Sequence, residues 1–244
     1  MRKKTPKRLS SFNLEPGTVL GDKYEILSLL GKGWEGEVYQ VRELGLDIIR
    51  AAKFFLPHRN PANRTLRFYA RKLHKLRHCP ILIQYHTREK VLIDEIPVTF
   101  LVSEYVEGEL LSDFLKTQPG KRLTPFEGMH LLHALASGVE SIHMSREYHG
   151  DLHTDNVIIG RRGLSFDVKL VDMFNWGPAT AQSIRDDVSD LIRILYDSLG
   201  GARHYSRQPQ VVKEVCCGLK RSLIESKFRT AGELREYLEN LTWE

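Results

Sequence analysis

The feature that most constrains this chain is a polar stretch at 149–156, which reads His-Gly-Asp-Leu-His-Thr-Asp-Asn. Asp151 and Asn156 lie five residues apart in it, and the apolar residues 157–159 that follow are typical of a strand. Asp172 ends a second apolar strand sixteen residues beyond Asn156. A loop carboxylate can orient a hydroxyl, while an amide oxygen and a second carboxylate are ligands that hard cations prefer. The pattern favours a metal–phosphate site over three unrelated polar residues in loops.

The composition is that of a soluble globular protein. Apolar residues make up 41% and charged residues 27% of the 244 positions, which is ordinary for such proteins. This length allows one large domain or two small lobes, each with its own core. No apolar run approaches the roughly 20 residues that a membrane-spanning helix needs. We therefore expect no membrane segment.

The chain begins with a basic segment that no hydrophobic stretch follows, unlike a secretion signal. We expect residues 1–20 to form a flexible basic tail, because chain ends are usually frayed. The three cysteines, Cys79, Cys216 and Cys217, lack metal-ligand spacing, and the adjacent pair are poor disulfide partners. A reducing, cytoplasmic location fits this cysteine pattern best.

Positive charge is concentrated in the first part of the chain. Residues 1–88 hold 18 Lys and Arg against 7 Asp and Glu, and within 48–88 ten basic residues occur without any acid. Such a block can mark a site for a polyanion, including nucleic acid. The block has no aromatic stacking platform and no recognised nucleic-acid motif, so nucleic acid is not favoured. A solvated helix face beside a phosphate pocket fits better.

A glycine-rich turn joins two strand-like runs near the start of the chain. Gly31, Gly33 and Gly36 form a G-x-G-x-x-G pattern between apolar residues 24–30 and an alternating run through Val38. Glycines let backbone N–H groups approach phosphate oxygens without interference from Cβ. The same pattern can open a dinucleotide-binding helix, but the β-branched residues that follow favour a hairpin.

A lysine lies on the next predicted strand, at 48–55. Lys53 has apolar neighbours and follows the glycines by about 20 residues. A lysine in this setting is usually a surface residue of the strand. At this distance from a glycine-rich turn, however, it is well placed to contact the α- and β-phosphates of a nucleotide.

The remaining periodicity predicts a mainly helical second half. Apolar spacing indicates helices over 64–77, 110–116, 125–144, 186–199, 209–219 and 231–241, and strands over 81–87 and 98–103. Thr124, Pro125 and Glu127 form a helix start, with a capping residue, a first-turn proline and a capping-box glutamate. No internal repeat is present.

In order and spacing, these motifs resemble those of the protein kinase family over roughly residues 20–240. Residues 31–38 resemble its glycine-rich loop, Ala51-Ala52-Lys53 its third-strand lysine motif, and 101–108 its hinge. The polar stretch 149–156 resembles the catalytic loop and 171–174 the metal-binding motif. The resemblance extends to the start of the central helix near Asp187 and to a final arginine element at Arg229.

The resemblance implies a fold and a division of the chain. The fold class is α+β, a two-lobe kinase fold with a five-stranded antiparallel sheet and one helix in the N-lobe and a shortened, mainly helical C-lobe. The tail would cover residues 1–20. The N-lobe, with the glycine-rich loop and Lys53, would cover 21–105, and the C-lobe, with the catalytic loop, would cover 106–244.

The resemblance also implies roles for single residues. Asp151 would be the catalytic base, and His153, where many protein kinases have lysine, would steady the transferring phosphoryl group. Asn156 and Asp172 would hold Mg²⁺, with Mn²⁺ as an alternative. Lys53 and the backbone of the turn at Gly31, Gly33 and Gly36 would contact the phosphates of ATP. The adenine would lie among Val38, Ala51 and Ile158, with the backbone of Glu104 and Val106 at its edge.

The helix of the first half departs from the family pattern. Residues 62–77 contain no Asp or Glu, and Tyr69 occupies the position expected for the glutamate that pairs with the strand lysine. We therefore expect Lys53 to depend on Asp172 or on nucleotide for its charge partner.

The second half departs from the family pattern in the segment that, in protein kinases, regulates activity and docks the peptide substrate. Gly150 replaces an arginine that reads a phosphorylated activation loop, and Met173-Phe174 replaces a Phe-Gly pair. Only 14 residues separate Asp172 from Asp187, without an Ala-Pro-Glu segment between them. Switching by activation-loop phosphorylation is then not expected, and Arg229 lacks its usual glutamate.

The catalytic loop also resembles that of aminoglycoside- and choline-type small-molecule kinases. Three functions stay open: a kinase that phosphorylates Ser or Thr of a protein with ATP and Mg²⁺, a kinase for a small-molecule hydroxyl, and a pseudokinase that acts through nucleotide or partner binding. Retention of Lys53, Asp151, Asn156 and Asp172 favours the first. Tyr69 and the short segment after Asp172 favour the third.

Overall fold

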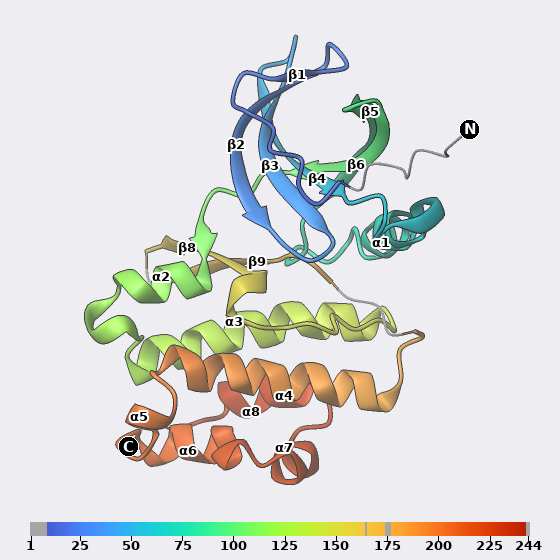
Figure 1. Cartoon of the computed structure of the whole chain (residues 1–244). Helices are drawn as coiled ribbons and strands as arrows, with labels where there is room; N and C mark the ends of the chain where they lie inside the picture. The colour runs from blue at the N-terminus through green and yellow to red at the C-terminus, as the bar shows by residue number, and fades with distance from the viewer. Residues whose placement is uncertain (1–8, 164, 174–176, 243–244) are drawn as a thin grey trace. The chain divides into compact units, whose positions relative to one another are not determined.

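The computed structural model describes residues 9–163, 165–173 and 177–242. It divides into two compact units (Figure 1). The first, called here the sheet unit, is Met1–Arg77 with Ile83–Val106, and the second, the helical unit, is His78–Leu82 with Glu107–Glu244. The short segment His78–Leu82 joins the helical unit because the C=O of Ile81 accepts a hydrogen bond from the N–H of Leu170 at 2.7 Å.

The sheet unit is built on one antiparallel sheet in the order β1-β2-β3-β4-β6-β5. Its strands are β1 (Val19–Leu20), β2 (Tyr24–Lys32), β3 (Gly36–Glu43), β4 (Ile48–Phe55), β5 (Tyr85–Ile93) and β6 (Ile96–Glu104). The five predicted strands are present, and the two-residue β1 adds a sixth at the edge. β5 begins later than predicted because Ile81 and Leu82 are buried in the helical unit instead of pairing in the sheet.

Alternation along the strands gives the sheet a packed face and a half-exposed face. Tyr39, Ala52 and Phe54 are buried in one cluster, with Phe54 stacked on Phe100 at a ring-centroid distance of 4.5 Å. Side chains alternate along a strand, so Val38, Ala51 and Lys53 lie on the opposite face. Val38 pairs directly with Lys53 across β3 and β4. Three of the residues expected at a nucleotide, Val38, Ala51 and Lys53, therefore share one face of the sheet.

Residues 9–20 pack on the sheet and do not form part of a flexible tail. Leu9, Phe12 and Leu20 are buried in the core cluster of the sheet unit. Glu37 on β3 accepts hydrogen bonds from the Ser11 hydroxyl at 2.7 Å and from the Phe12 N–H at 3.2 Å. The expectation for residues 1–20 is therefore wrong from residue 9 onward, because it weighed basic charge and missed this apolar anchor. Residues 1–8 lie outside the described part of the chain.

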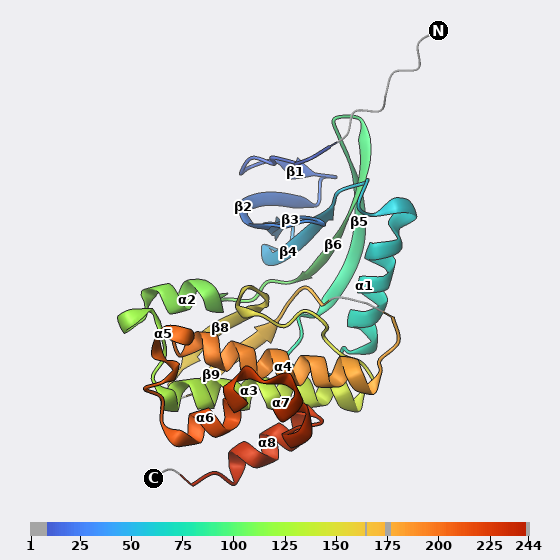
Figure 2. The ribbon, with the colours of Figure 1, turned by 60° about the horizontal axis from the view of Figure 1, so that its bottom comes forward.

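The single long helix of the sheet unit is α1 (Arg64–Lys75), preceded by the short turn η1 (Pro61–Asn63). It runs along β5 (Figure 2). Leu66, Tyr69 and Leu73 are buried on one side of the helix, while Arg64, Arg67 and the other exposed basic residues cover the opposite side. The amphipathic pattern that predicted this helix is confirmed.

Two long helices form the centre of the helical unit. These are α3 (Pro125–Met144) and α4 (Ala181–Ser198), which lie side by side (Figures 1 and 2). The predicted capping box at the start of α3 is present: Thr124 and Glu127 exchange side-chain and backbone hydrogen bonds. α4 begins five residues before the predicted start because Thr180 and Ser183 form a second box.

Shorter elements complete the helical unit. They are α2 (Leu111–Thr117), α5 (Ala202–Tyr205), α6 (Gln210–Cys216), α7 (Arg221–Lys227) and α8 (Ala231–Glu239), with the 3-10 turns η2 (Pro119–Lys121), η3 (Thr154–Asn156) and η4 (Cys217–Leu219). A three-stranded sheet in the order β7-β8-β9 joins β7 (Glu109–Leu110), β8 (Val157–Arg162) and β9 (Ser165–Leu170). Of these helices, α5 and α7 were not predicted.

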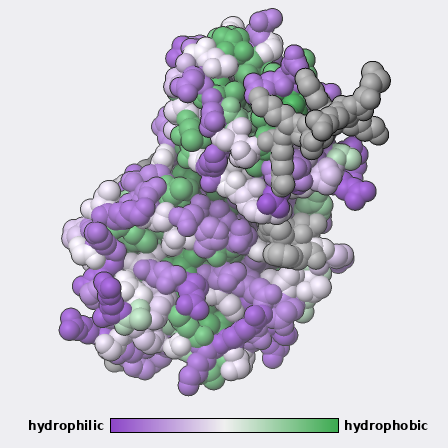
Figure 3. Space-filling view, in the orientation of Figure 1, coloured by the Kyte–Doolittle hydropathy of each residue, from purple (hydrophilic) through white to green (hydrophobic). Residues whose placement is uncertain are grey.

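None of the helices in the described ranges has the length and apolar character needed to cross a membrane. The face of the helical unit seen in Figure 3 is mainly hydrophilic, with small separate hydrophobic patches. The predicted cytoplasmic location stays a prediction.

Candidate active site

A buried carboxylate of α4 fixes the start of the polar loop at 149–156. Asp187 has no exposed surface. Its Oδ2 accepts a hydrogen bond from the N–H of His149 at 2.7 Å, and its Oδ1 accepts one from the N–H of Gly150 at 2.8 Å. Hydrogen bonds to an ionised carboxylate are among the strong ones in proteins. The helix thus sets the position of the backbone immediately before Asp151.

Two histidines extend this network. His143, in the last turn of α3, places Nε2 3.1 Å from Oδ2 of Asp187. His149 is buried, with Nε2 3.0 Å from the C=O of Val171 and Nδ1 3.3 Å from the N–H of Asp151. One neutral tautomer of His149 satisfies both contacts, because Nε2–H donates to the carbonyl and Nδ1 accepts from the amide. The loop is thereby tied to the segment that carries Asp172.

Hydrogen bonds from its side-chain NH₂ group orient the amide of Asn156. Nδ2 donates to the C=O of Asp151 at 2.8 Å and to Oδ2 of Asp151 at 3.2 Å. These bonds leave Oδ1 as a hydrogen-bond acceptor to which no residue in the described ranges donates. An amide oxygen held in this way is a suitable ligand for a hard cation.

The carboxylate of Asp151 and the ring of His153 lie beside Asn156. The Asp151 side chain is half-exposed, with Oδ2 3.7 Å from Nε2 of His153. His153 accepts a hydrogen bond at Nδ1 from the N–H of Asp155 at 3.2 Å, and its Nε2 lies 2.9 Å from Nδ2 of Asn156. The three predicted side chains of the polar loop therefore meet at one place. Their exposure leaves Asp151 and His153 accessible to a ligand.

Strand pairing brings Asp172 next to Asn156. Val157 at the start of β8 pairs with Leu170 at the end of β9, and the N–H of Val171 donates to the C=O of Asn156 at 3.0 Å. Asp172 follows with φ of 55°, a left-handed conformation that costs a non-glycine residue on the order of 1 kcal/mol. Such backbone strain gathers at functional sites. Phe174, the last residue of this motif, lies outside the described residues.

The donors at Asn156 and Asp172 fit a divalent cation. Within the described ranges, no three His, Cys, Asp or Glu side chains cluster closely enough to bind a metal alone. Mg²⁺ commonly binds to one or two carboxylates and takes its other ligands from phosphate and water. An amide oxygen and a carboxylate on adjacent chain segments suit that mode of binding.

The glycine-rich turn closes the hairpin of β2 and β3. The N–H of Gly33 donates to the C=O of Gly36 at 2.8 Å, and the N–H of Leu56 donates to the C=O of Glu35 at 2.9 Å. A Cβ at Gly36 would lie 1.7 Å from the C=O oxygen of Phe54, so only glycine fits there. Nothing lies within 4 Å of a Cβ at Gly31 or Gly33. This close approach requires glycine at position 36, whereas Gly31 and Gly33 leave space above an exposed backbone.

Lys53 contacts a carboxylate of this turn and two aromatic rings. Its Nζ lies 3.2 Å from Oε2 of Glu35, with 12% and 24% of the two side chains exposed. The same Nζ lies 4.9 Å from the ring centroid of Tyr69 and 5.5 Å from that of Phe55. The residue at the expected glutamate position therefore offers the face of a ring to the ammonium group, a favourable cation–π arrangement. The expectation that Lys53 would depend only on Asp172 or nucleotide missed Glu35.

The residues expected at adenine lie in both units. Val38 and Ala51 are on the half-exposed face of the large sheet, and Ile158 is half-buried on β8. The N–H of Glu104 donates a hydrogen bond to the C=O of Gln84 at 2.9 Å, and the C=O of Glu104 accepts one from the Ser103 hydroxyl at 3.4 Å. The N–H of Val106 has no hydrogen-bond partner among the described residues. The C=O of Glu104 and the N–H of Val106 are the acceptor and the donor expected at the edge of the adenine.

The structure shows the local setting of two departures from the family pattern. Gly150 has φ of 84°, in the left-handed region that favours glycine, and its N–H reaches Asp187 in that conformation. Arg229 is exposed, and its side chain forms no ion pair with any described residue.

Sequence reasoning missed two residues that organise the site. Asp187 was noticed as part of a helix start, but its spacing does not reveal that it lies under the polar loop. Glu35 stands inside the glycine pattern, and only the hairpin turn directs it toward Lys53. An acid between two glycines of the pattern was the one available signal, and by itself it is weak.

Several known proteins are similar to this chain. The family model described as the protein kinase domain matches residues 24–215. A probable serine/threonine-protein kinase of Streptomyces coelicolor is 30% identical over 156 residues, which are 63% of this chain and 22% of that protein. The serine/threonine-protein kinase PrkC of Bacillus subtilis is 28% identical over 68% of this chain and 24% of its own length. The chain thus spans about a quarter of the length of these two relatives.

Two other similar proteins match this chain over most of their own length. The probable serine/threonine-protein kinase YbdM of Bacillus subtilis is 27% identical, with 92% of this chain and 91% of that protein covered. The kinase domain of Mycobacterium tuberculosis PknI has the same fold, with a TM-score of 0.66 and 20% identity over 93% of this chain and 98% of that domain. The match to the family model covers well over half of the sequence. The chain belongs to the protein kinase family.

Proposed function

We propose that this chain transfers the γ-phosphoryl group of ATP to the hydroxyl of Ser or Thr in a protein, with Mg²⁺ as the cation. The observation that carries the proposal is the polar loop, in which Asp151 and Asn156 are hydrogen-bonded to each other and anchored to Asp187. The similar curated proteins named above are serine/threonine-protein kinases. ATP and a divalent cation are general to this family.

In this proposal Asp151 holds the acceptor hydroxyl. Its carboxylate takes the hydroxyl proton as the oxygen bonds to the γ-phosphorus and the bond to the β–γ bridging oxygen breaks, so that ADP leaves. His153, beside Asp151, is placed to donate a hydrogen bond to a phosphoryl oxygen when its ring nitrogen carries a proton. The cation, when bound at Asn156 and Asp172, supplies charge neutralisation for the phosphates.

The sheet unit supplies the groups for the rest of the nucleotide. Lys53 presents an ammonium group for the α- and β-phosphates, and the open backbone at Gly31 and Gly33 can approach phosphate oxygens. Val38 and Ala51 provide an apolar surface for adenine. The positions of these groups on one sheet face support the proposal.

The test is phosphoryl transfer from γ-labelled ATP to a generic protein substrate, with Asp151→Asn as the variant. We expect the rate to fall at least about a thousandfold, which is about 4 kcal/mol of barrier, while ATP affinity changes little. Asp155→Asn is the matched control, because Asp155 is an exposed acid of the same loop. Equal rates in Asp151→Asn and the parent protein would contradict the proposed role.

The setting of Lys53 favours one second candidate, a nucleotide-binding protein without turnover. Tyr69 supplies a ring where the family has a carboxylate, so catalysis could depend on a weaker contact. Calorimetry of ATP binding with Mg²⁺ and with EDTA, and with Asp172→Ala, separates the two. Metal-dependent binding without label in any protein band supports the second candidate. Label only on hydroxylated metabolites supports a small-molecule acceptor.

A further inference from the structure

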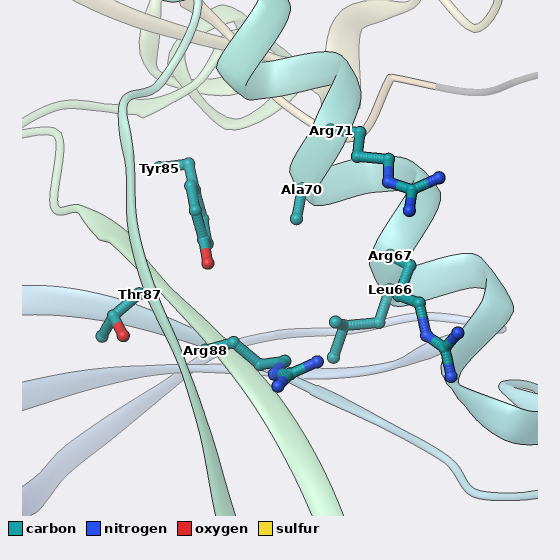
Figure 4. Close-up of a pocket in the computed structure, with 7 residues that line it drawn as sticks. All are labelled: Leu66, Arg67, Ala70, Arg71, Tyr85, Thr87 and Arg88. Carbon is teal, nitrogen blue, oxygen red and sulfur yellow. The ribbon is translucent and has the colours of Figure 1, made fainter.

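Three arginines of the basic block line a cavity on the sheet unit that the proposed function does not use. The cavity has a volume of about 460 Å³ and lies between α1 and β5 (Figure 4). Four lining residues come from α1, namely Leu66, Arg67, Ala70 and Arg71, and three come from β5, namely Tyr85, Thr87 and Arg88. None of them is among the residues assigned above to ATP, Mg²⁺ or catalysis.

Three arginines give this cavity its charge. Arg67 donates a hydrogen bond to the C=O of Ala62 at 2.8 Å. Arg71 and Arg88 are exposed, and in the described part of the chain neither side chain has a hydrogen bond or an ion pair. Arg88 extends from β5 toward α1 (Figure 4). Two arginines from different elements thus border one hollow without a protein anion.

No acidic residue near the lining arginines in the sequence offsets the positive charge of this cavity. Residues 48–88 contain no Asp or Glu. Glu89, the next residue of β5, has its carboxylate 2.7 Å from Nζ of Lys23. The strand alternates its side chains, so Glu89 points to the opposite side from Arg88. An anion entering the cavity would therefore meet unopposed positive charge.

The floor of the cavity is less polar than its rim. Leu66 is buried, Ala70 is half-buried, and Tyr85 directs its ring between the strand and the helix (Figure 4). The cavity therefore suits an occupant with a short apolar body and a compact anionic group.

We propose that this cavity binds a phosphorylated Ser or Thr side chain of a peptide segment. Guanidinium groups match phosphate oxygens in geometry and charge, and arginine clusters are a recurrent means of recognising phosphorylated residues. Nucleic acid fits less well, because strand binding needs an extended basic groove with several stacking rings, and one tyrosine lines this cavity. A membrane surface fits less well because the charge surrounds a hollow.

The experiment measures binding without ATP, so its outcome does not depend on whether the chain is an active kinase. The probe is a fluorescein-labelled peptide with one phosphothreonine among alanines, followed by fluorescence anisotropy. The unphosphorylated peptide, a labelled single-stranded oligonucleotide and phosphatidylserine vesicles are the comparison arms. We expect the phosphopeptide to bind more tightly than all three, and inorganic phosphate to compete with it.

Matched variants locate the site. Arg71→Gln with Arg88→Gln is expected to weaken phosphopeptide binding at least about tenfold, because each change removes a charge-assisted contact. The control is Arg64→Gln with Lys90→Gln, which removes the same charge from exposed positions of α1 and β5 that do not line the cavity. The control should retain binding within about twofold. Each single arginine variant should be intermediate, and urea unfolding establishes that all variants fold.

Three results would overturn the proposal. One is equal binding of phosphorylated and unphosphorylated peptide. Another is an equal loss in the test and control pairs, which would indicate general charge attraction. The third is tighter binding of the oligonucleotide or the vesicles, which would assign the basic surface to a different class of partner.

Discussion

The two groups of candidate residues are held in place in opposite ways. In the helical unit, the backbone before Asp151 is bonded to Asp187, a carboxylate without exposed surface. In the sheet unit, Lys53 is held by a partly exposed carboxylate from a turn and by aromatic ring faces. The first arrangement is rigid and costly to disturb, whereas the second can adjust when a ligand binds. The departures from the family pattern at Lys53 thus fall where the structure tolerates them.

The electrostatic character of the two regions differs in the same direction. α4 carries Asp186, Asp187 and Asp190 within five residues. Burial, together with the negative charges of Asp187 and Asp186, raises the pKa of Asp190 to about 7. In the sheet unit, the partly exposed carboxylate of Glu35 lies 3.2 Å from Nζ of Lys53. The helical unit therefore holds a cluster of acidic side chains around one buried carboxylate, whereas Lys53 in the sheet unit has a partly exposed acid beside its ammonium group.

The largest effect is expected for Asp187→Asn. The amide would keep one acceptor but direct an NH₂ group at a backbone N–H of His149 or Gly150, so a buried donor would lose its partner. We expect the free energy of unfolding to fall by about 2–4 kcal/mol, measured by urea denaturation, and phosphoryl transfer to fall with it. The control is Asp186→Asn, which breaks an exposed ion pair with Arg221 and should cost less than about 1 kcal/mol. Similar losses in both variants would mean that the loop is not anchored by Asp187.

The next effect is a pH dependence at Asp190. Its folded-state pKa of about 7 lies above the ordinary value of 3.8, so the folded state disfavours the ionised form. Below about pH 4, Asp190 therefore does not reduce the free energy of unfolding. This free energy falls as the pH rises from 4 toward and through 7. The side chain is half-buried, so we discount the full shift and expect Asp190→Asn to raise the free energy of unfolding by about 2 kcal/mol at pH 8. Urea denaturation at pH 4 and pH 8 measures this. A gain of the same size at both values would contradict the titration.

The difference between the two regions also explains what sequence could predict. Elements with strong periodicity, such as α1 and α3, were predicted to within about two residues, and the capping box of Thr124 and Glu127 was identified from its spacing. Asp151 and Asn156 contact each other within one short loop, and the pairing of β8 with β9 places the segment that carries Asp172 beside them, so local sequence contains most of that geometry. The family resemblance added the roles.

Contacts between distant segments were beyond reach of the same reasoning. Asp187 lies 37 positions from Gly150, and the burial of Phe12 depends on strands that follow it in the chain. A polar or basic stretch gives no sign that its neighbours will be covered. Tyr69 was identified as a substitution for glutamate, but its ring contact with Lys53 depends on how α1 packs on the sheet.

A moderate effect is expected at Tyr69. Tyr69→Leu removes the ring that faces Nζ of Lys53, and we expect kcat/KM for ATP to fall about tenfold, since a partly desolvated cation–π contact contributes about 1–2 kcal/mol. Tyr69→Phe keeps the ring and should stay within twofold. Tyr69→Glu supplies the carboxylate typical of the family and should recover most of the loss. Assays are run well below the Tm of each variant, and a loss in Tyr69→Phe equal to that in Tyr69→Leu would exclude the ring as the cause.

The smallest effect is expected at Glu35, and its sign tests how the sheet unit differs from the helical one. If Lys53 binds phosphate as proposed, the carboxylate 3.2 Å from its Nζ competes with the nucleotide and repels its charge. Glu35→Gln should then tighten MgATP binding about two- to fivefold by calorimetry, because partly exposed ion pairs contribute up to about 1 kcal/mol. The gain should shrink at high salt. Glu89→Gln, which breaks the ion pair with Lys23 on the same sheet, is the control and should leave binding unchanged. Weaker binding in Glu35→Gln would instead make Glu35 a fixed support for Lys53, and the sheet unit would then resemble the helical unit in holding its charged group rigidly.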